Sequence, residues 1–539
     1  MATVTTSCFE EQTLRLVPNE QPEGFVAERA SGSIGQPLNE YLRKLEENAG
    51  SNDRLATLPL NNAFNPFLPT PPPGSPRGKT ASELGINEDA LVPVHDATVD
   101  DLIKAKIHEA ELSGEESAFF VGDLSDVYSA VKKWKQSPLG DRVEIFYAVK
   151  CNPSPVVLHL LSLMGTSFDC ASVAEINTVL SLPSAPSPDR IIFANPCKPV
   201  SFIRAAANSG VEMMTFDNAD ELHKIARSHR GAKLVLRILT DDSKSLCRLG
   251  LKFGAPLSTC AGLIKLAKQL GLDVIGVSFH VGSGCKDPMQ FADAVWRAKQ
   301  VFEMGKAEGY RFTFLDVGGG FEAVVFDEMS KVLRDSLEVY FPVAEGVRVV
   351  AEPGRFLVAP AFTLATSIIA RRKALEEESV EDVQMVEKVE GEGADVMYYI
   401  NDGVYSAFNC IMFDHQIVHP YPLTIGQDVE RAIPRLAGPP PPNVHLAQDL
   451  TVTMGYKDTE RASVWGPTCD SIDCVRNLVH LPRGIQVGDW LGWGEMGAYT
   501  MCAASSFNGM PIAPSHFTTG GQGEDSREVR RILDSFVAY

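Results

Sequence analysis

From Val143 onward, short apolar segments alternate with longer stretches in which apolar residues recur at helical spacing. Short apolar runs bounded by turn residues are typical of buried strands. Helical spacing marks Val173–Leu182 and Ala219–Ser228, and it recurs through Leu263–Leu270 and Phe291–Ala298. The pattern predicts eight strands, at Val143–Val149, Thr166–Cys170, Arg190–Ala194, Glu212–Phe216, Lys233–Leu239, Leu272–His280, Phe312–Val317 and Val347–Glu352.

Strands of this kind with helices between them favour a (β/α)8 barrel, and an open doubly wound sheet is the alternative. The barrel is favoured by the positions of the chemically interesting residues, which fall at or near the carboxyl ends of the predicted strands. In a barrel those ends converge on one mouth, so residues roughly 200 positions apart meet there. The residues so placed are Lys150, Asp169, Asn195, Arg237, His280, Gly318 and Glu352.

The alternation stops after about Phe356, and the later β-like runs are short: Met397–Ile400, Gln486–Leu491 and Tyr499–Ala503. We interpret them as a separate antiparallel β domain. The predicted organisation is a disordered Pro-rich extension over 1–85, a segment contributing to the β domain over 86–140, the barrel over 141–356 and the C-terminal β domain over 357–539. Loop inserts are expected near 376–392, which is acidic, and near 417–461, which is Pro-rich.

Composition and charge narrow the possible functions. The chain has 539 residues, and its net charge of −20 disfavours a nucleic-acid or anionic-membrane partner. The amino terminus lacks an apolar secretory segment, and the longest apolar stretch, near Phe356–Ala370, is interrupted by Pro360 and is too short to span a bilayer. The eleven cysteines are scattered and none forms a CxxC pair. We therefore expect a cytoplasmic protein with reduced thiols and no nucleic-acid or membrane partner.

One lysine, Lys150, stands at the end of the first predicted strand. A lysine there is either a solvated strand-end cation or an amine held in a pocket, ready to form a Schiff base with an aldehyde cofactor. Four later clusters favour the second interpretation, because each supplies a part that a phosphate-bearing pyridine cofactor needs. The clusters are His280 with Ser283, Gly318–Gly320, Glu352–Arg355, and Cys469 with Asp470. Together they predict a pyridoxal-phosphate enzyme.

Two glycine-bearing loops are suited to a phosphate. Gly318, Gly319 and Gly320 follow a predicted strand, and three glycines let backbone N–H groups approach an anion closely. A glycine run alone is more often a simple turn. Gly354 adds another N–H at the end of the next strand, and Arg355 supplies a permanent positive charge beside it. Loops on neighbouring strands form a phosphate cup where barrels commonly have one.

Three further residues have both an ordinary and a chemical interpretation. Glu352 could be a general base or a metal ligand, but opposite a pyridine nitrogen it would favour the protonated ring, and no cluster with metal-ligand spacing surrounds it. His280 is either a half-buried structural histidine or an imidazole stacked on the cofactor, with Ser283 donating to the phosphate. Cys469, in the turn-forming context Gly466-Pro467, is either an ordinary thiol or a proton donor.

Several multi-residue motifs, in order over roughly residues 90 to 515, resemble those of the eukaryotic ornithine decarboxylase family. The motifs are Phe146–Asn152, Phe168–Ser172, Ala194–Lys198, Val277–Gly284, Asp316–Phe321, Ala351–Arg355 and Trp465–Asp470. The resemblance implies a pyridoxal 5′-phosphate-binding (β/α)8 barrel with a β domain. It also implies a substrate, L-ornithine, and a product, putrescine.

The resemblance carries roles to individual residues. It implies that Lys150 holds the cofactor, that Asp169 and Arg237 support its site, that His280 stacks on the ring and that Glu352 faces the pyridine nitrogen. The implied phosphate contacts are Ser283, Gly318, Gly319, Gly320, Gly354, Arg355 and Tyr499. The implied substrate site contains Cys469 as proton donor, Asp414 and Asp470 as acceptors of the distal amine, Phe507 near the carboxylate, and Phe413, where animal members often carry tyrosine.

The resemblance also implies a homodimer whose active sites are shared, with Cys469 and Asp470 contributed by the partner subunit. It leaves regulation by antizyme open. One alternative is a related decarboxylase acting on lysine or arginine. The other is a catalytically inactive homologue resembling the antizyme inhibitors; such proteins lose cofactor and catalytic residues, whereas Lys150, Asp169 and Cys469 are present here.

Overall fold

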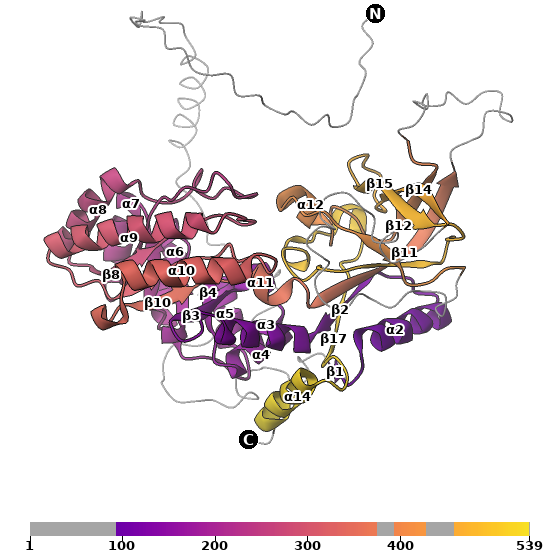
Figure 1. The fold of residues 1–539 in the computed structure, drawn as a ribbon, viewed down its shortest axis with the longest axis horizontal. Helices are drawn as coiled ribbons and strands as arrows, with labels where there is room; N and C mark the ends of the chain where they lie inside the picture. Colours follow the sequence, from indigo (N-terminus) through magenta and orange to yellow (C-terminus); the bar gives the residue numbers. More distant parts are fainter. Residues whose placement is uncertain (1–92, 374–392, 427–457, 538–539) are drawn as a thin grey trace, which may run out of the picture. The chain divides into compact units, whose positions relative to one another are not determined.

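Eight short apolar strands pair in parallel and close into a barrel in the order β10-β3-β4-β5-β6-β7-β8-β9 (Figure 1). The computed structural model describes residues 93–373, 393–426 and 458–537. The barrel strands are β3 Val143–Ala148, β4 Ser167–Cys170, β5 Ile191–Phe193, β6 Met213–Phe216, β7 Lys233–Arg237, β8 Asp273–Ser278, β9 Phe314–Asp316 and β10 Arg348–Ala351. The predicted fold class is therefore confirmed.

Helices connect successive barrel strands and cover their outer faces. They are α4 Pro155–Leu163, α5 Val173–Leu180, α6 Val200–Asn208, α7 Ala219–Ser228, α8 Leu257–Gln269, α9 Met289–Ala307 and α10 Phe326–Tyr340. Helix α3 Leu124–Gln136 precedes the first barrel strand β3, and the short α11 Arg355–Val358 follows the last one, β10. Strand side chains alternate between the helices and the barrel interior. The interior-facing set forms its own buried cluster, separate from the large core, of Phe146, Ile192, Met213, Val235, Phe314 and Val350. The barrel is thus packed with side chains, and only its mouth is open to chemistry.

A nine-stranded sheet forms the second architectural element. Its strands are β1 Val94–His95, β2 Phe119–Asp123, β11 Phe362–Lys373, β12 Val396–Ile400, β13 Pro420–Pro422, β14 Thr459–Trp465, β15 Cys474–Pro482, β16 Trp490–Trp493 and β17 Ser515–Thr518. The long strand β11 pairs antiparallel with β2, β16 and β12. The sheet also contains the parallel pairs β1–β17, β17–β2 and β12–β14. Helix α2 Val99–Ser113 packs against β2 of this sheet, and the short α12 Asn409–Phe413 lies between β12 and β13 in the chain. The last helix, α14 Glu524–Val537, packs against the barrel helices α3 and α4.

Some sequence expectations about the β domain need correction. Tyr499–Ala503 is not a strand, because Tyr499 has a φ of +55° and the 3-10 helix η8 follows at Met501–Ala503. The strand expected at Gln486–Leu491 begins only at Trp490. The insert expected from 417 to 461 is not all loop, since it contains β13 and the start of β14. Residues 427–457 of that insert, the insert near 376–392 and the Pro-rich extension lie outside the described residues.

Among the helices of the described residues, none is both long enough and apolar enough to cross a membrane.

Candidate functional site

Lys150 lies at the barrel mouth in the 3-10 turn Val149–Cys151, directly after β3. Its ammonium forms an ion pair with Asp169, which lies on the neighbouring strand β4. The Lys150 side chain is 38% exposed, whereas Asp169 is fully buried. Burial lowers the pKa of Lys150, but the carboxylates of Asp169 and Glu352 outweigh that effect and raise it above its ordinary value. The structure thus brings together two of the predicted site residues and keeps the amine protonated at neutral pH.

A second carboxyl group, Glu352, follows β10 on the side of the mouth next to β3 and β9. Burial, with Asp169 and Asp316 nearby, raises its pKa well above the usual value. Burial also raises the pKa of Asp316, the last residue of β9, to about 7, although the Gly318 N–H donates to it at 2.9 Å. Sequence analysis assigned no role to Asp316. Two buried carboxyl groups side by side cannot both ionise easily, so a positive charge bound next to them would be stabilised.

His280 is held in a neutral form. Its Nδ1 accepts a hydrogen bond of 2.9 Å from the Gly282 backbone N–H, so in the neutral ring the proton is on Nε2. Burial, together with the positive charges of Arg237 and Lys150, lowers the pKa of His280 well below its ordinary value. An uncharged imidazole is therefore presented beside Gly319, whose hypothetical Cβ would meet Nε2 at 2.9 Å.

The loops after β8, β9 and β10 approach one another so closely that glycine is required. Gly318 has a φ of +66°, and a Cβ there would lie 2.2 Å from the Phe279 carbonyl oxygen. The N–H groups of Gly319, Gly320 and Gly354 donate to no other residue that the structure describes. Three donors without protein partners in adjoining loops form the kind of cradle that binds an anion. The Ser283 side chain is half-buried in the same region.

Arg355 begins α11 beside this cradle. Its guanidinium forms an ion pair with Asp414, and its Nε lies 3.4 Å from Oε1 of Glu322. It also lies over the Tyr499 ring, 5.3 Å from the centroid. Burial disfavours its charge, but Asp414 and Glu322 raise its pKa above the ordinary value. The structure thus joins a predicted phosphate contact to a predicted substrate contact, and it adds Glu322, which sequence analysis missed.

Arg237 ends β7 at the same mouth. Its guanidinium lies over the Phe253 ring, 5.1 Å from the centroid, and its backbone carbonyl accepts from the Ala255 N–H at 2.9 Å. It acts on the site through its charge, which is one of the causes of the lowered His280 pKa.

The remaining predicted residues form a second cluster. The Tyr405 hydroxyl donates to Asp470, and the Tyr405 ring stacks on Phe507 with centroids 4.2 Å apart. The Cys469 backbone N–H donates to Asn508 Oδ1 at 3.4 Å. The hydrogen bond from Tyr405 lowers the pKa of Asp470, so this carboxylate stays ionised. Cys469 and Phe507 are exposed, ready to face a ligand or another chain.

No hydrogen bond or ion pair between described residues joins Cys469 or Asp470 to Lys150. Phe413 is 74% exposed at the end of α12, directly before Asp414. Within one chain, the predicted site residues therefore fall into two clusters. The first surrounds Lys150 and Arg355, and the second surrounds Cys469 and Asp470.

A buried aspartate, Asp473, shapes the loop that carries Cys469. Its carboxylate accepts from the Val404 N–H at 2.8 Å, the Thr468 N–H at 3.0 Å and the Thr468 hydroxyl at 2.6 Å. Sequence analysis missed this residue, although an aspartate three positions after Asp470, close to the Gly466-Pro467 turn, is a signal for such a local network. Among the described residues, no cluster of three or more histidine, cysteine or acidic side chains could hold a metal ion.

The first cluster fits a phosphorylated pyridine aldehyde. The Lys150 amine lies at the barrel mouth, and the buried carboxyl pair of Glu352 and Asp316 would be stabilised by a positive charge. The glycine loops have N–H groups that can bind an anion. One oxygen of the buried Asp169, Oδ1, also lacks a hydrogen-bond partner among the described residues. Buried polar groups without hydrogen-bond partners cost free energy, and such a ligand would supply partners for the glycine N–H groups and for the carboxyl pair.

Comparisons with known proteins agree with this geometry. The family described as pyridoxal-dependent decarboxylase, pyridoxal binding domain, matches residues 124–359. Ornithine decarboxylase of Schizosaccharomyces pombe is 45% identical over 430 residues, which cover 80% of this chain and 89% of the relative. Antizyme inhibitor 2 of Xenopus laevis is 45% identical over 77% of this chain and 84% of the relative. The arginine decarboxylase of Paramecium bursaria Chlorella virus, solved with agmatine, has a TM-score of 0.65 at 30% identity, covering 78% of this chain and 100% of that one.

Proposed function

Since this chain belongs to the family of pyridoxal-dependent decarboxylases, we propose that it converts L-ornithine to putrescine and CO2, the first step of polyamine synthesis. The cofactor is pyridoxal 5′-phosphate. The observation that carries the proposal is the meeting, at one barrel mouth, of the Lys150 amine, the buried carboxyl pair and the N–H groups of the glycine loops.

Residues of the first cluster would hold the cofactor. The Lys150 amine would hold its aldehyde group, while Gly319, Gly320 and Gly354 would bind its phosphate through their N–H groups, with Arg355, Ser283 and Tyr499 nearby. When bound, the cofactor would supply an electron-accepting ring. Glu352 would favour a proton on the ring nitrogen, because a buried carboxylate is stabilised by a positive charge next to it. Neutral His280 would face the ring without adding a competing charge.

Residues near Arg355 and in the second cluster would handle the substrate. Asp414 and ionised Asp470 accept the distal ammonium of ornithine, which suits a short diamine product. Phe507 and Phe413 supply apolar surface near the substrate, where a carboxylate is poorly solvated and its loss as CO2 is favoured. The Cys469 thiol then delivers a proton to the α-carbon.

We also propose that the active site is completed across a homodimer. Supporting this, Cys469 and Phe507 are exposed in the single chain, and the second cluster has no bond to Lys150 within the described residues. The partner subunit would bring its own copy of the second cluster to the mouth. Cytoplasmic localisation and binding by antizyme are further expectations, and similarity to an antizyme inhibitor supports the second.

An assay across three amino acids tests the activity. Purified protein with added cofactor is expected to release CO2 from ornithine at least tenfold faster than from lysine or arginine, and to show the visible absorbance band of bound cofactor. Lys150→Ala should abolish both signals. The matched control Lys233→Ala removes an exposed lysine at the opposite end of the barrel and should abolish neither. A preference for lysine or arginine would favour the related decarboxylases, and absence of both signals in the unaltered protein would favour an inhibitor-like homologue.

A further inference from the structure

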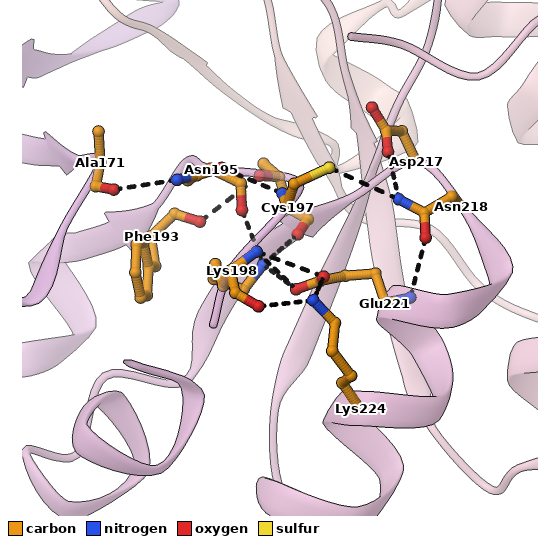
Figure 2. Close-up of polar contacts among 10 residues, drawn as sticks. Ala171, Phe193, Asn195, Cys197, Lys198, Asp217, Asn218, Glu221 and Lys224 are labelled. Atoms are coloured by element: carbon orange, nitrogen blue, oxygen red, sulfur yellow. Dashed lines mark hydrogen bonds and ion pairs between the residues drawn. The ribbon is translucent and has the colours of Figure 1, made fainter. Parts of the chain in front are cut away.

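Lys198 is fully buried and binds the chain at the carboxyl ends of β5 and β6. Figure 2 shows its polar contacts. Its Nζ donates to the backbone carbonyls of Asn195 at 2.8 Å and Thr215 at 2.6 Å. It also forms an ion pair of 2.9 Å with buried Glu221, on α7. An ammonium group has three N–H donors, so all three are used. Lys224 contacts the other oxygen of Glu221 and the Lys198 carbonyl.

Burying these charged groups costs free energy. Burial lowers the pKa of Lys198 to about 8, even though Glu221 opposes the change. A buried ion pair loses the hydration of both charges, and apolar side chains of similar size often stabilise a fold equally well. What apolar side chains cannot do is hold two backbone carbonyls from neighbouring strands at set positions. The cost therefore indicates that the backbone at these two strand ends must be held in a defined position.

The strand ends held by Lys198 connect to the Lys150 pair. Asn195, whose carbonyl Lys198 binds, donates from its side chain to the Ala171 carbonyl at 3.2 Å (Figure 2). The Ala194 N–H donates to the Cys170 carbonyl at 2.9 Å. Cys170 and Ala171 directly follow Asp169, the ion-pair partner of Lys150. A shift of the β5 end would therefore move the Asp169 backbone through two adjacent hydrogen bonds.

The cluster also connects to β7, the strand that pairs with β6 on the side away from β5. Asn218, the N-cap of α7, accepts from the Glu221 N–H and donates to Asp217 Oδ1 at 2.8 Å (Figure 2). The other oxygen of Asp217 accepts from the Gly254 N–H at 2.9 Å. The residue after Gly254 donates its N–H to the carbonyl of Arg237. Lys198 and Glu221 thus lie between the two strand ends that carry Asp169 and Arg237.

We propose that Lys198, paired with Glu221, is a positioning residue that sets the Asp169 carboxylate against Lys150. It touches neither cofactor nor substrate and acts through Asn195 and the end of β4. Reacting groups displaced by about 1 Å lose roughly a hundredfold in rate, so a small movement of Asp169 has a measurable effect. The inference goes beyond the proposed reaction, because it concerns how the cofactor site is held and not which amino acid is used.

Two variants test the proposal. Lys198→Met removes the three donors and leaves buried Glu221 with Lys224 as its remaining ion-pair partner. Lys198→Met with Glu221→Gln removes both charges and should regain most of the lost thermal stability. We expect both proteins to bind cofactor. The pH at which the visible absorbance band of the cofactor changes should differ from that of the unaltered protein, because Asp169 has moved relative to Lys150. We expect kcat to fall roughly tenfold to a hundredfold, with KM for ornithine altered less than threefold, since Asp414 and Asp470 are not connected to the cluster.

The matched control is Arg142→Met. Arg142 donates to the carbonyls of Val347 and Phe341 at 3.0 and 2.9 Å, so it is also a cation that binds two backbone carbonyls, but at the amino end of β3. It should lose stability and keep the band and kcat. The proposal is overturned if the double variant is folded with an unchanged band and kcat, or if Arg142→Met produces the same spectral shift. The pH dependence of the band reads the Lys150 site directly, so it remains decisive even if ornithine is not the substrate.

Discussion

Arg355 and Asp414 form an ion pair at the barrel mouth, although the sequence assigns them to different ligands. Arg355 is expected to bind the cofactor phosphate and Asp414 the distal amine of the substrate. A guanidinium group held by a carboxylate is less available to a phosphate, so the two anions compete for Arg355. Once the phosphate takes Arg355, Asp414 is released to accept an ammonium group. Cofactor binding and amine binding should therefore favour each other.

This competition predicts opposite effects of Asp414→Asn on two ligands. Removing the carboxylate frees Arg355, so the dissociation constant for pyridoxal phosphate should fall severalfold. The same change removes an acceptor for the substrate ammonium, and KM for ornithine should rise about tenfold or more. An absorbance titration of the cofactor-free protein measures the first effect, and steady-state kinetics measure the second.

Glu322→Gln is the matched control, since Glu322 is the other carboxylate near Arg355, at 3.4 Å from Nε. It should also tighten cofactor binding, but it should leave KM for ornithine unchanged because Glu322 has no predicted contact with substrate. Equal KM values for the Asp414 variant and the unaltered protein would contradict the assignment of Asp414 to the amine.

Asp169→Asn should move the pH profile of cofactor attachment downward. Only the neutral Lys150 amine attacks an aldehyde, and Asp169 contributes to the raised pKa of Lys150. Without the carboxylate that pKa falls, so attachment at pH 7 should be faster in the variant. The rate at which the visible band appears, measured from pH 6 to 10, gives both profiles. Asp141→Asn, an exposed change at the far end of the barrel, should leave the profile in place; an upward shift for Asp169→Asn would refute the argument.

The barrel was predictable because its signal is local and repeated. Each strand is a short apolar run, as in Val143–Ala148, and each site residue follows such a run directly. The order of the strands then places Lys150 beside Asp169 and His280 beside Gly318. For these residues, position along a strand is enough to predict a common location.

Other features depend on contacts that no local pattern records. Tyr499 lies in an apolar segment that looks like a strand, but its N–H binds the Cys151 carbonyl and its φ of +55° ends any extended conformation. The pairing of Arg355 with Asp414 joins positions 59 apart. The buried pair Lys198–Glu221 looks like two ordinary charges in sequence, because only the fold shows that both side chains are fully buried. We propose that a partner chain brings the second cluster to Lys150, and no pattern within one sequence specifies such an arrangement between two chains.

Asp402 should make the protein less stable as the pH rises. It is buried, and burial raises its pKa to about 7 despite N–H donors at Gly403 and Ala407. In the unfolded chain its pKa is near the ordinary value of 3.8, so the folded state binds a proton more tightly. The stabilisation from this group is present below about pH 4 and is lost as the pH rises to about 7.

Asp402→Asn keeps an oxygen acceptor and cannot ionise, so it should escape this loss. Between pH 4 and 7, the free energy of unfolding of the variant should rise relative to that of the unaltered protein by up to about 4 kcal/mol. This follows from about 1.4 kcal/mol per unit of pKa shift. Denaturant unfolding at several pH values measures the difference, in which the other titrating groups cancel. If the difference in free energy of unfolding does not change with pH, ionising Asp402 in the folded protein costs no free energy.

Cys469→Ala should slow the reaction and misplace the proton. The thiol is the predicted donor to the α-carbon, and without it the proton can reach the cofactor's own carbon instead. The expected result is release of CO2 with formation of an aldehyde and pyridoxamine phosphate, detected by chromatography. Cys197→Ala removes another exposed thiol and should give putrescine at the normal rate. If the Cys469 variant forms only putrescine and does so at that rate, Cys469 is not the proton donor.

Mixing two variants that each form little or no putrescine tests whether Lys150 and Cys469 act from different chains. If they do, Lys150→Ala mixed with Cys469→Ala gives heterodimers in which one of two sites has both residues intact. Random exchange makes about half of the dimers mixed, so about a quarter of the unaltered activity should return. Lys150→Ala mixed with a chain carrying both substitutions should recover nothing, because every site then lacks one of the two residues. If exchange is demonstrated by mass spectrometry and activity still does not return, then Cys469 must reach Lys150 within its own chain. In that case the loop shaped by Asp473 would have to move towards the barrel mouth when substrate binds.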